Sequence, residues 1–553
     1  MGKNGTGGIV LFAALCGASV FSSARAEART YTVNPTSSCT LPLAVLAANT
    51  GKKQGGCSAG SADSNTINLE AGTYTLTSSL VITKSLIIDG DGVGSSIVRS
   101  NLSSGTDFII VQPGTTNTSV TLKELTIDKA ATQTAPNVCG VYVYGTATQT
   151  ASLSVQSARI AGHTWSGLYS HDANLSVADT TIENNSSPEA GGGIHVSASI
   201  SLRGSFFVDR SVINNNTSVA NGGGIYFSGQ QSSQIRDTTI SGNSGVHGGG
   251  VAYDSADPSN GYFAMVNCTV ARNGASTTGG GIYTPPSSSS YDANVVSVGS
   301  IIANNVAHFI QDWDGHLHSF NASLIGDTLG MDRHNPDEPP PVGNLFDVDP
   351  MLDPVLRSWG GPTKVHRLLP GSPAIDAIPA GNTGSTTDQR NTMRPQFGGV
   401  DGEMYDMGAY EETRIETEIT PVANKTSSVT HTIVSNAGYS NGQGTNLQST
   451  ANGQFVTYVT PGSISGGTYK LVVGFKKGAN GGIWQLATSQ TLTGTYTNRG
   501  SAQDGRAGSD TWTSVNFGNV SLPFGLAFFR FTVTGTSGSG RQMFPDYIEL
   551  TRQ

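Results

Sequence analysis

The chain has 553 residues and 71 glycines, only 12 % of its residues are charged, and its formal net charge at pH 7 is −9. An acidic chain without Lys/Arg clusters offers no basic field, so we expect no nucleic-acid partner. Long surface helices need Glu, Lys and Arg, and a chain this rich in small polar residues is therefore predicted to be all-β.

The N-terminus has the pattern of an export signal. Lys3 precedes an apolar stretch over residues 9–21, and Ala24-Arg25-Ala26 forms a small-residue cleavage box. The apolar stretch is too short to cross a bilayer. We expect residues 1–26 to be a signal peptide cleaved after Ala26, no membrane span, and a secreted, extracellular protein.

Two cysteines flank an apolar, helix-like segment near the start of the expected mature chain. Cys39 and Cys57 lie on either side of residues 40–49. An exported protein can oxidise such a pair, so we predict a disulfide that holds an N-terminal cap at about residues 30–60. Two free thiols are the alternative. Cys139 and Cys268 are isolated and are expected to be small core residues.

A glycine-aromatic signature recurs along the first half of the chain. The last glycine of each copy stands at position 140, 167, 193, 224, 250 or 281, so the copies are 26 to 31 residues apart. Such a period predicts a solenoid whose repeats bury their apolar faces against one another. Further along each repeat, one position holds His163, Asn185, Asn216, Asn243, Asn273 and Asn305. Asn tolerates a left-handed turn, so we predict the asparagine ladder of a parallel β-helix.

The residues that alternate with the inward isoleucines form an outward column. This column is predicted to contain Tyr142, Tyr169, His195, Tyr226, Ala252 and Tyr283. Flat aromatic surfaces bury the apolar faces of sugar rings, so Tyr142, Tyr169 and Tyr283 are candidate substrate-binding residues for a polysaccharide. The alternative is that these rings pack under loops or against the C-terminal part of the chain.

A second outward column lies two residues further on. It is predicted to contain Tyr144, His171, Ser197, Ser228, Asp254 and Pro285. A polysaccharide lyase needs a base that removes a proton beside a uronate carboxylate and an acid that protonates the departing oxygen. His195, His171, Tyr226 and Asp254 are therefore candidate catalytic residues. A glycosidase, which needs two opposed carboxylates, and a plain solvated surface are the alternatives.

Two further groups of charged residues are candidates for binding. Asp179, Arg210, Asp237 and Asn267 precede the ladder, where alternating charge predicts ion pairs between coils. The alternative is that Arg210 with Asp237 binds an anionic sugar. The run at residues 308–318 is dense in titratable residues, and loop carboxylates suit calcium, so Asp312 and Asp314 are candidate calcium ligands. We expect no other cofactor.

The region from about residue 31 to 411 resembles the exported right-handed β-helix proteins whose C-terminal part is called the choice-of-anchor Q domain. The motifs that carry the resemblance are Gly360-Gly361-Pro362-Thr363, Leu368-Leu369-Pro370-Gly371-Ser372-Pro373, Asp388-Gln389-Arg390 and Asp406-Met407-Gly408-Ala409-Tyr410-Glu411. The resemblance implies extracellular placement and a right-handed parallel β-helix over residues 27–412, closed by residues 345–412. It implies no reaction.

The C-terminal part alternates strands with Gly/Ser/Asn turns. After a linker at residues 413–423, this pattern predicts a jelly-roll-like β-sandwich over residues 424–553. The strand order and the ending Asp546-Tyr547-Ile548-Glu549-Leu550 resemble galactose-binding-like carbohydrate-binding modules. Trp484 and Tyr439 are predicted to be loop aromatics that stack on sugars, and Trp512 is expected in the core.

These patterns predict an exported, monomeric protein that interacts with an extracellular polysaccharide. Three functional classes stay open: a lyase that cleaves a uronate-containing glycan, an adhesin that binds without catalysis, and a glycoside hydrolase.

Overall fold

The computed structural model describes residues 28–553, with gaps at 62–64, 106, 200–203, 230–231, 255–261, 286–294, 318, 334–342, 370, 380–384, 395–396, 399–403, 419, 421, 440–441, 461–462 and 465. The expected signal peptide, residues 1–26, lies outside the described residues. The described chain is all-β apart from the helix α1 (Leu41–Thr50), as predicted. No helix in these ranges is long and apolar enough to cross a membrane.

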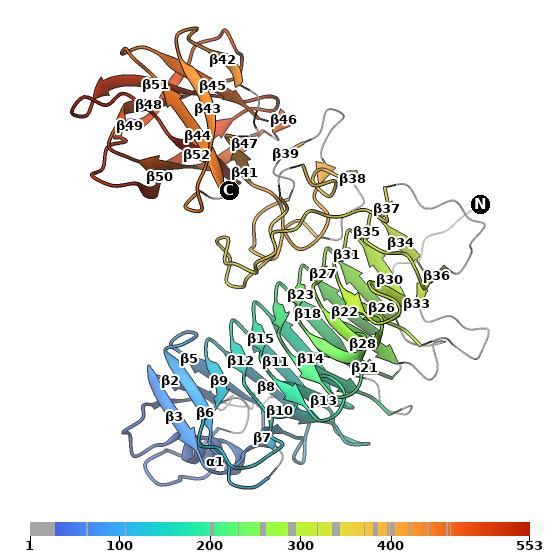
Figure 1. The fold of residues 1–553 in the computed structure, drawn as a ribbon. Helices are drawn as coiled ribbons and strands as arrows, with labels where there is room; N and C mark the ends of the chain where they lie inside the picture. Colours follow the sequence, from blue (N-terminus) through green and yellow to red (C-terminus); the bar gives the residue numbers. More distant parts are fainter. Residues whose placement is uncertain are drawn as a thin grey trace, which may run out of the picture.

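Residues 29–346 form a parallel β-helix whose coils stack side by side (Figure 1). Its first sheet contains β1 (Arg29–Val33), β2 (Asn65–Leu69), β5 (Leu86–Gly90), β8 (Thr118–Lys123), β11 (Ala151–Gln156), β14 (Asn174–Ala178), β18 (Phe206–Asp209), β22 (Ser232–Arg236), β26 (Tyr262–Val266), β30 (Val295–Val298) and β34 (Ser319–Asn321). Its second sheet contains β4 (Leu80–Ile82), β7 (Asp107–Val111), β10 (Cys139–Tyr144), β13 (Leu168–His171), β17 (Ile194–Ser197), β21 (Ile225–Ser228), β25 (Val251–Asp254), β29 (Ile282–Tyr283), β33 (Trp313–Leu317) and β36 (Met331–Arg333).

Two more parallel sheets complete the coils. The third contains β3 (Gly72–Leu76), β6 (Ser96–Ser100), β9 (Thr126–Lys129), β12 (Arg159–Ala161), β15 (Thr181–Glu183), β19 (Val212–Asn214), β23 (Thr239–Ser241), β27 (Thr269–Ala271), β31 (Ile301–Ala303), β35 (Leu324–Ile325) and β37 (Leu345–Phe346). The fourth is short and contains β16 (Ser186–Ser187), β20 (Thr217–Ser218), β24 (Ser244–His247), β28 (Gly274–Thr278) and β32 (Val306–Ala307).

The core of the β-helix is built from the inward residues of each coil. The predicted inward column is in register from coil to coil and fully buried: Val141, Leu168, Ile194, Ile225, Val251 and Ile282. Burying one such aliphatic side chain contributes roughly 1.5–3 kcal/mol. The stack is therefore stable only because each coil covers the apolar face of the next.

The asparagine ladder is present as predicted and extends to an acidic end. Each amide nitrogen donates to the side-chain oxygen of the next coil, at 2.9 Å from Asn185 to Asn216 and from Asn243 to Asn273. At the last step, Asn305 Nδ2 donates to Asp312 Oδ1 at 2.8 Å, and the backbone N–H of Asn305 donates to the same oxygen at 2.9 Å. Asp312 thus ends the ladder inside the protein.

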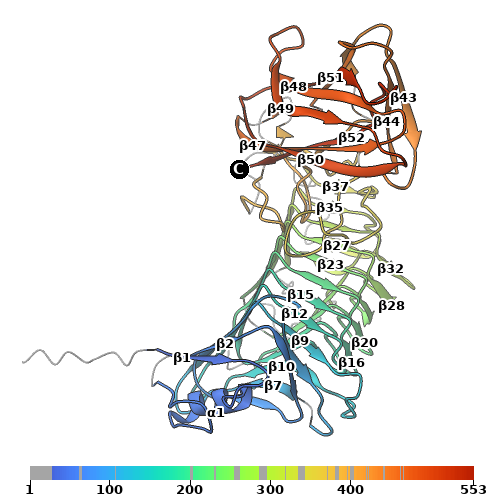
Figure 2. The ribbon, with the colours of Figure 1, turned by 90° about the vertical axis from the view of Figure 1, so that its left-hand side faces the viewer.

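The N-terminal end of the stack is covered by α1. The predicted disulfide between Cys39 and Cys57 is confirmed. Pro42 lies in the first turn of the helix, where backbone N–H groups have no intrahelical acceptor, so its lack of an N–H costs no hydrogen bond. Gly51 ends the helix in the left-handed conformation, and its N–H bonds to the carbonyl of Ala47. In Figure 2 the helix lies at the end of the stack remote from the C-terminal sheets.

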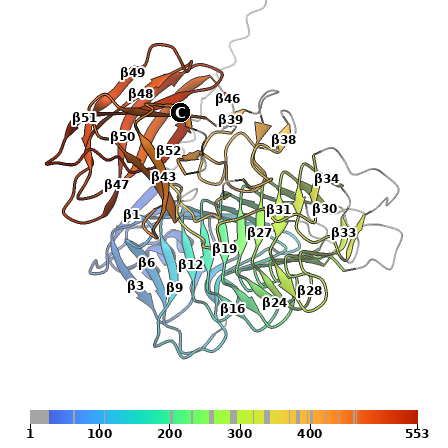
Figure 3. The same ribbon diagram turned by 45° about the horizontal axis from the view of Figure 1, so that its top comes forward.

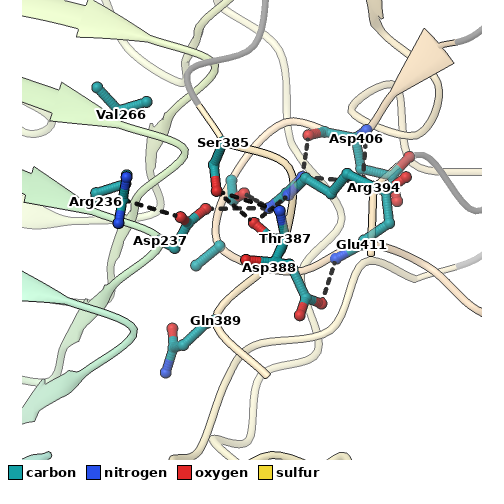
Figure 4. A network of polar contacts seen from close by, with 12 residues as sticks. Arg236, Asp237, Val266, Ser385, Thr387, Asp388, Gln389, Arg394, Asp406 and Glu411 are labelled. Carbon is teal, nitrogen blue, oxygen red and sulfur yellow. Dashed lines mark hydrogen bonds and ion pairs between the residues drawn. The ribbon is translucent and has the colours of Figure 1, made fainter. Parts of the chain in front are cut away.

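The closing region, residues 345–412, folds back along the third sheet of the β-helix. Gln389 accepts a hydrogen bond from Thr239 at 2.6 Å, and His366 Nε2 lies 2.7 Å from Ser241 Oγ. Arg394 lies 3.9 Å from the buried carboxylate of Asp237 (Figure 4). Within this region β38 (Ile378–Pro379) pairs with β40 (Met404–Tyr405), and β39 (Phe397–Gly398) pairs with β46 (Ser463–Ile464) of the C-terminal part. Figure 3 shows it between the β-helix and the C-terminal sheets.

The C-terminal part is a sandwich of antiparallel sheets around its own core. One sheet contains β41 (Arg414–Glu416), β52 (Pro545–Arg552), β47 (Gly467–Lys477) and β50 (Thr511–Leu522). The other contains β42 (Val422–Lys425), β45 (Phe455–Val459), β51 (Phe528–Thr536), β48 (Gly482–Ser489) and β49 (Thr497–Asp504), beside the hairpin β43 (Thr430–Ser435) and β44 (Gln443–Gln448). The segment expected as a linker, residues 413–423, contains β41 and thus pairs with the sandwich.

Candidate functional site

The outward column lies on the second sheet of the β-helix, in the predicted order. Tyr142, Tyr169, His195, Tyr226, Ala252 and Tyr283 pair in register across β10, β13, β17, β21, β25 and β29. The ring centroids of Tyr142 and Tyr169 are 4.9 Å apart, those of Tyr169 and His195 are 4.4 Å apart, and those of His195 and Tyr226 are 5.0 Å apart. This spacing follows from the distance between neighbouring parallel strands.

The orientation of these rings corrects the expected stacking mode. Tyr142 and Tyr169 are tilted by 38°, and Tyr169 and His195 by 31°, so these rings partly face one another, whereas His195 and Tyr226 meet edge-on at 75°. Ring faces that cover one another are not free to stack on a sugar. The column therefore offers solvent mainly ring edges and phenol hydroxyls, while the ring stacking stabilises the coils.

The gap at Ala252 is closed by the protein itself. Ala252 is fully buried, and the ring of His247 stacks on Tyr283 with centroids 4.8 Å apart. His247 comes from β24, in the fourth sheet, just before the glycines of its coil. The alternation of residues along the strands does not predict the contact between His247 and Tyr283. His247 lies on β24 of the fourth sheet and not on a strand of the second sheet, where the outward column lies.

His195 is held as a neutral imidazole inside the column. Its side chain is nearly buried, with 8 % of the residue exposed, and burial lowers its pKa to about 4. Nδ1 lies 3.0 Å from the carbonyl oxygen of Ala190. A carbonyl can only accept, so Nδ1 carries the proton and Nε2 keeps a lone pair. At neutral pH this nitrogen is a hydrogen-bond acceptor and a weak base.

The second outward column places further polar groups beside the first. His171 Nδ1 lies 2.8 Å from Ser197 Oγ on the next coil, and His171 Nε2 lies 3.5 Å from the carboxylate of Asp172. Tyr226 donates from its hydroxyl to Asp254 Oδ2 at 3.3 Å. Burial and the Asp254 carboxylate raise the pKa of Tyr226 to about 12, so this phenol stays protonated.

The electrostatics of this face are neutral to acidic. Strands β7, β10, β13, β17, β21, β25 and β29 contain no Lys or Arg. Asp107 and Asp254 lie on these strands, and the nearby histidine His195 is neutral. The face therefore has hydrogen-bond donors and acceptors, but these strands supply no fixed cation.

Arg210 was a candidate for binding an anionic sugar, and its contacts correct that prediction. Its Nε and Nη2 donate to the two oxygens of Asp179 at 2.9 and 3.0 Å, and Nη1 pairs with Asp209. Asp237 faces Arg236 and Arg394 instead. The charged row thus forms ion pairs between coils, as its favoured interpretation predicted, and its four members adopt positive φ angles of 43–51°.

The metal candidates do not form a ligand set. Asp312 accepts hydrogen bonds from Asn305, and burial raises its pKa to about 6. Asp314 accepts a hydrogen bond from Thr278 at 2.7 Å. In the part of the chain that the structure describes, no group of three or more His, Cys, Asp or Glu side chains is placed to hold a metal ion. The candidate calcium ligands Asp312 and Asp314 are thus engaged in hydrogen bonds within the protein.

Both aromatic candidates of the sandwich differ from the prediction. Trp484 lies on β48 and is only 2 % exposed, because it alternates with Ile483 and points into the core beside Phe475. Tyr439 is 4 % exposed and contacts Trp512 edge-on. Trp512 is half-buried and lies outside the central cluster.

Tyr439 also borders a cavity of about 470 Å³ between the sandwich and the closing region. Trp359 and Arg357 of the closing region form part of the wall. The hydroxyl of Tyr439 and the indole N–H of Trp359 are buried without a hydrogen-bond partner among the described residues. Tyr439 is therefore nearly buried at the wall of this cavity and is not an open stacking platform.

Comparisons with known proteins agree with the solenoid. A family model described as a right-handed beta helix region matches residues 109–323. No curated protein sequence matches the chain.

The similar solved structures that follow each cover about a quarter of this chain. A xanthan lyase from Paenibacillus is 25 % identical, with 28 % of this chain and 14 % of that chain covered and a TM-score of 0.23. A carbohydrate-binding module of Cellvibrio mixtus lichenase 5A, in complex with cellotriose, is 18 % identical, with 25 % and 96 % covered and a TM-score of 0.19. A family 35 carbohydrate-binding module from Clostridium thermocellum is 20 % identical, with 25 % and 97 % covered and a TM-score of 0.18. The match thus spans about a seventh of the xanthan lyase.

Proposed function

We propose that this chain is a secreted protein that binds an extracellular polysaccharide along the second sheet of its β-helix. The observation that carries the proposal is the pair of in-register columns, which set phenol, imidazole, hydroxyl and carboxylate groups side by side over successive coils. Sugar hydroxyls both donate and accept hydrogen bonds, so such a surface suits them. The repeat of the columns along the stack suits a repeating ligand.

The preferred ligand is a neutral polysaccharide. Strands β7 to β29 of this sheet carry carboxylates and no Lys or Arg, so a uronate chain would meet no fixed counter-charge there. The tyrosine rings are held by their neighbours, which lowers the entropy lost when a ligand orders their hydroxyls. Binding in this form needs no catalytic group and corresponds to an adhesin or a glycan-anchoring protein.

The test is affinity electrophoresis of the full chain through gels that contain neutral or uronate-containing polysaccharides. Tyr169→Phe removes one hydroxyl and keeps the ring stack, and Asp254→Ala removes the carboxylate that accepts from the Tyr226 hydroxyl. Each is expected to weaken binding about 2- to 10-fold, the effect of one net hydrogen bond. The control is Phe207→Ala, which removes an exposed ring from the first sheet. Unchanged retardation of both column variants would refute the proposal.

A second candidate function is β-elimination of a uronate-containing glycan, favoured by one observation. His195 keeps an unprotonated Nε2, and its ring lies 5.0 Å from that of Tyr226, whose protonated phenol is an acid. His195 would remove the proton beside the uronate carboxylate, and Tyr226 would protonate the leaving glycosidic oxygen. A lyase forms unsaturated sugar ends that absorb in the ultraviolet. His195→Phe should abolish that signal while binding persists, and no signal from any uronate polysaccharide would exclude this activity.

A further inference from the structure

One end of the sandwich contains a small cavity of about 270 Å³. It lies at the turn that joins β48 to β49 and beside the end of β50, so it is lined from both sheets. Its walls are mainly hydroxyl groups, including those of Thr488, Thr491, Thr495 and Ser521, with Leu522 as an apolar floor. Trp512 and the Tyr439 cavity lie at the start of β50, at the other end of that strand.

Among the described residues that line this cavity, Arg499 is the one that is charged. Its Nε donates to Thr488 Oγ1 at 2.8 Å, and its Nη groups make no hydrogen bond or ion pair within the described ranges of the chain. Partial burial without a nearby carboxylate lowers the pKa of Arg499. The contrast with the rest of the chain is clear, because many other arginines face a carboxylate: Arg99, Arg159, Arg210, Arg236, Arg357, Arg367, Arg390, Arg394 and Arg414.

A second uncompensated arginine lies on the same sheet. Arg530 of β51 stacks on the ring of Tyr496, 3.5 Å from its centroid, and its Nε donates to Thr457. Tyr496 belongs to the turn between β48 and β49 that surrounds the cavity. Neither arginine has a carboxylate partner among the residues that the structure describes, so this end of the sandwich carries a positive field without a neighbouring described counter-charge.

The chemistry of the cavity defines the ligand that it fits. A guanidinium with free Nη groups presents a planar fork that matches the two oxygens of a carboxylate. The surrounding hydroxyls can donate to and accept from sugar hydroxyls. Cavities for larger ligands are typically about 300–1,000 Å³, so this volume suits one sugar residue and not a chain segment.

We propose that this cavity binds an acidic sugar residue, with the sugar carboxylate on Arg499 and the sugar hydroxyls on the threonine and serine walls. The site is separate from the β-helix face and does not depend on the function proposed for it. This cavity would give the chain a second glycan-binding site, one that selects a negatively charged sugar. Strands β7 to β29 of the β-helix face carry no Lys or Arg and therefore provide no such selectivity. A sulfate ester offers the same oxyanion chemistry, and the experiment separates the two sources.

The test is isothermal titration calorimetry on the full chain with methyl β-D-glucuronide, methyl β-D-glucoside and sodium sulfate. The glucuronide should bind, and the glucoside, which lacks only the carboxylate, should bind at least about tenfold more weakly, because hydrogen bonds to charged groups are the stronger ones. Sulfate binding without glucuronide binding would overturn the assignment to an acidic sugar, and equal binding of glucuronide and glucoside would overturn it too.

Two variants tie the binding to the cavity. Arg499→Gln should weaken glucuronide binding at least about tenfold, whereas Arg506→Gln, at an exposed position outside the cavity wall, should leave it unchanged. Thr488→Val keeps the shape and removes the oxygen that orients Arg499, and should weaken binding a few-fold. This second variant serves if Arg499→Gln unfolds the sandwich, which circular dichroism would reveal. Wild-type affinity in both cavity variants would overturn the proposal.

Discussion

Replacing Asn243 by alanine tests the energetic role of the ladder. Asn243 Oδ1 accepts from the backbone N–H of Asn216 at 2.9 Å and from Asn216 Nδ2 at 3.0 Å, while Asn243 Nδ2 donates to Asn273 Oδ1 and to the carbonyl of Ile213, both at 2.9 Å. Asn216 Nδ2 keeps a bond to the carbonyl of Ile182, but the backbone N–H of Asn216 loses its acceptor. The orphaned backbone N–H of Asn216 costs about 1–3 kcal/mol. Each of the three other lost hydrogen bonds, to Asn216 Nδ2, Asn273 Oδ1 and the carbonyl of Ile213, costs about 1 kcal/mol.

The free energy of unfolding should therefore fall by about 4–6 kcal/mol in Asn243→Ala, measured by urea denaturation and far-ultraviolet circular dichroism. Asn68→Ala is the matched control, since Asn68 is exposed on β2 of the same β-helix, and it should change stability by less than about 0.5 kcal/mol. A loss in Asn243→Ala no larger than in the control would refute the reasoning. It would mean that the ladder positions need asparagine for turn geometry alone.

Three further changes have expected outcomes. Burial raises the pKa of Asp376 to about 8, so the folded chain holds a proton that the unfolded chain releases, and stability should fall as pH rises towards 8. In the wild type the free energy of unfolding should decline by about 2 kcal/mol between pH 6.5 and pH 8, measured by urea titration at these two pH values. Asp376→Asn should abolish this decline. Replacing both Cys39 and Cys57 by serine removes the disulfide that closes a loop of 18 residues, and should lower the free energy of unfolding by about 3 kcal/mol. Reductant should lower the stability of the wild type by the same amount. Gly224→Ala places a Cβ 2.6 Å from a carbonyl oxygen of the next coil and should lower the melting temperature, whereas Gly508→Ala, with open space around it, should not.

The repeats made the β-helix predictable from the sequence. Alternation within Gly-Ile-Tyr-Phe is a local property, and the repeat length fixes which residues of neighbouring coils meet. The outward order from Tyr142 to Tyr283 and the ladder from Asn185 to Asn305 follow from these two facts. What a strand pattern cannot give is the tilt of a ring, which depends on the neighbouring ring, and this is why the expected sugar platform became a self-covering stack.

The errors arise where a contact crosses between sheets or loops. The nearby glycines Gly481 and Gly482 predict a loop at Trp484, although Trp484, Leu486 and Thr488 stand at every second position and therefore share the inward face of a strand. His247 reaches Tyr283 from a different sheet, and Asp312 meets Asn305 across a turn. Arg499 was not singled out because a single basic residue carries no pattern, and only the structure shows that it lacks a counter-charge.

The in-register coils also bear on how such a protein changes over generations. Each coil repeats the same backbone path, so duplication or loss of one repeat leaves the ends of the stack and their caps intact. The outward face of the second sheet can then lengthen or shorten only in whole steps of about 4.8 Å. Selection would thus adjust the length of this face by copying a module, while the glycines and asparagines that define the module stay under constraint.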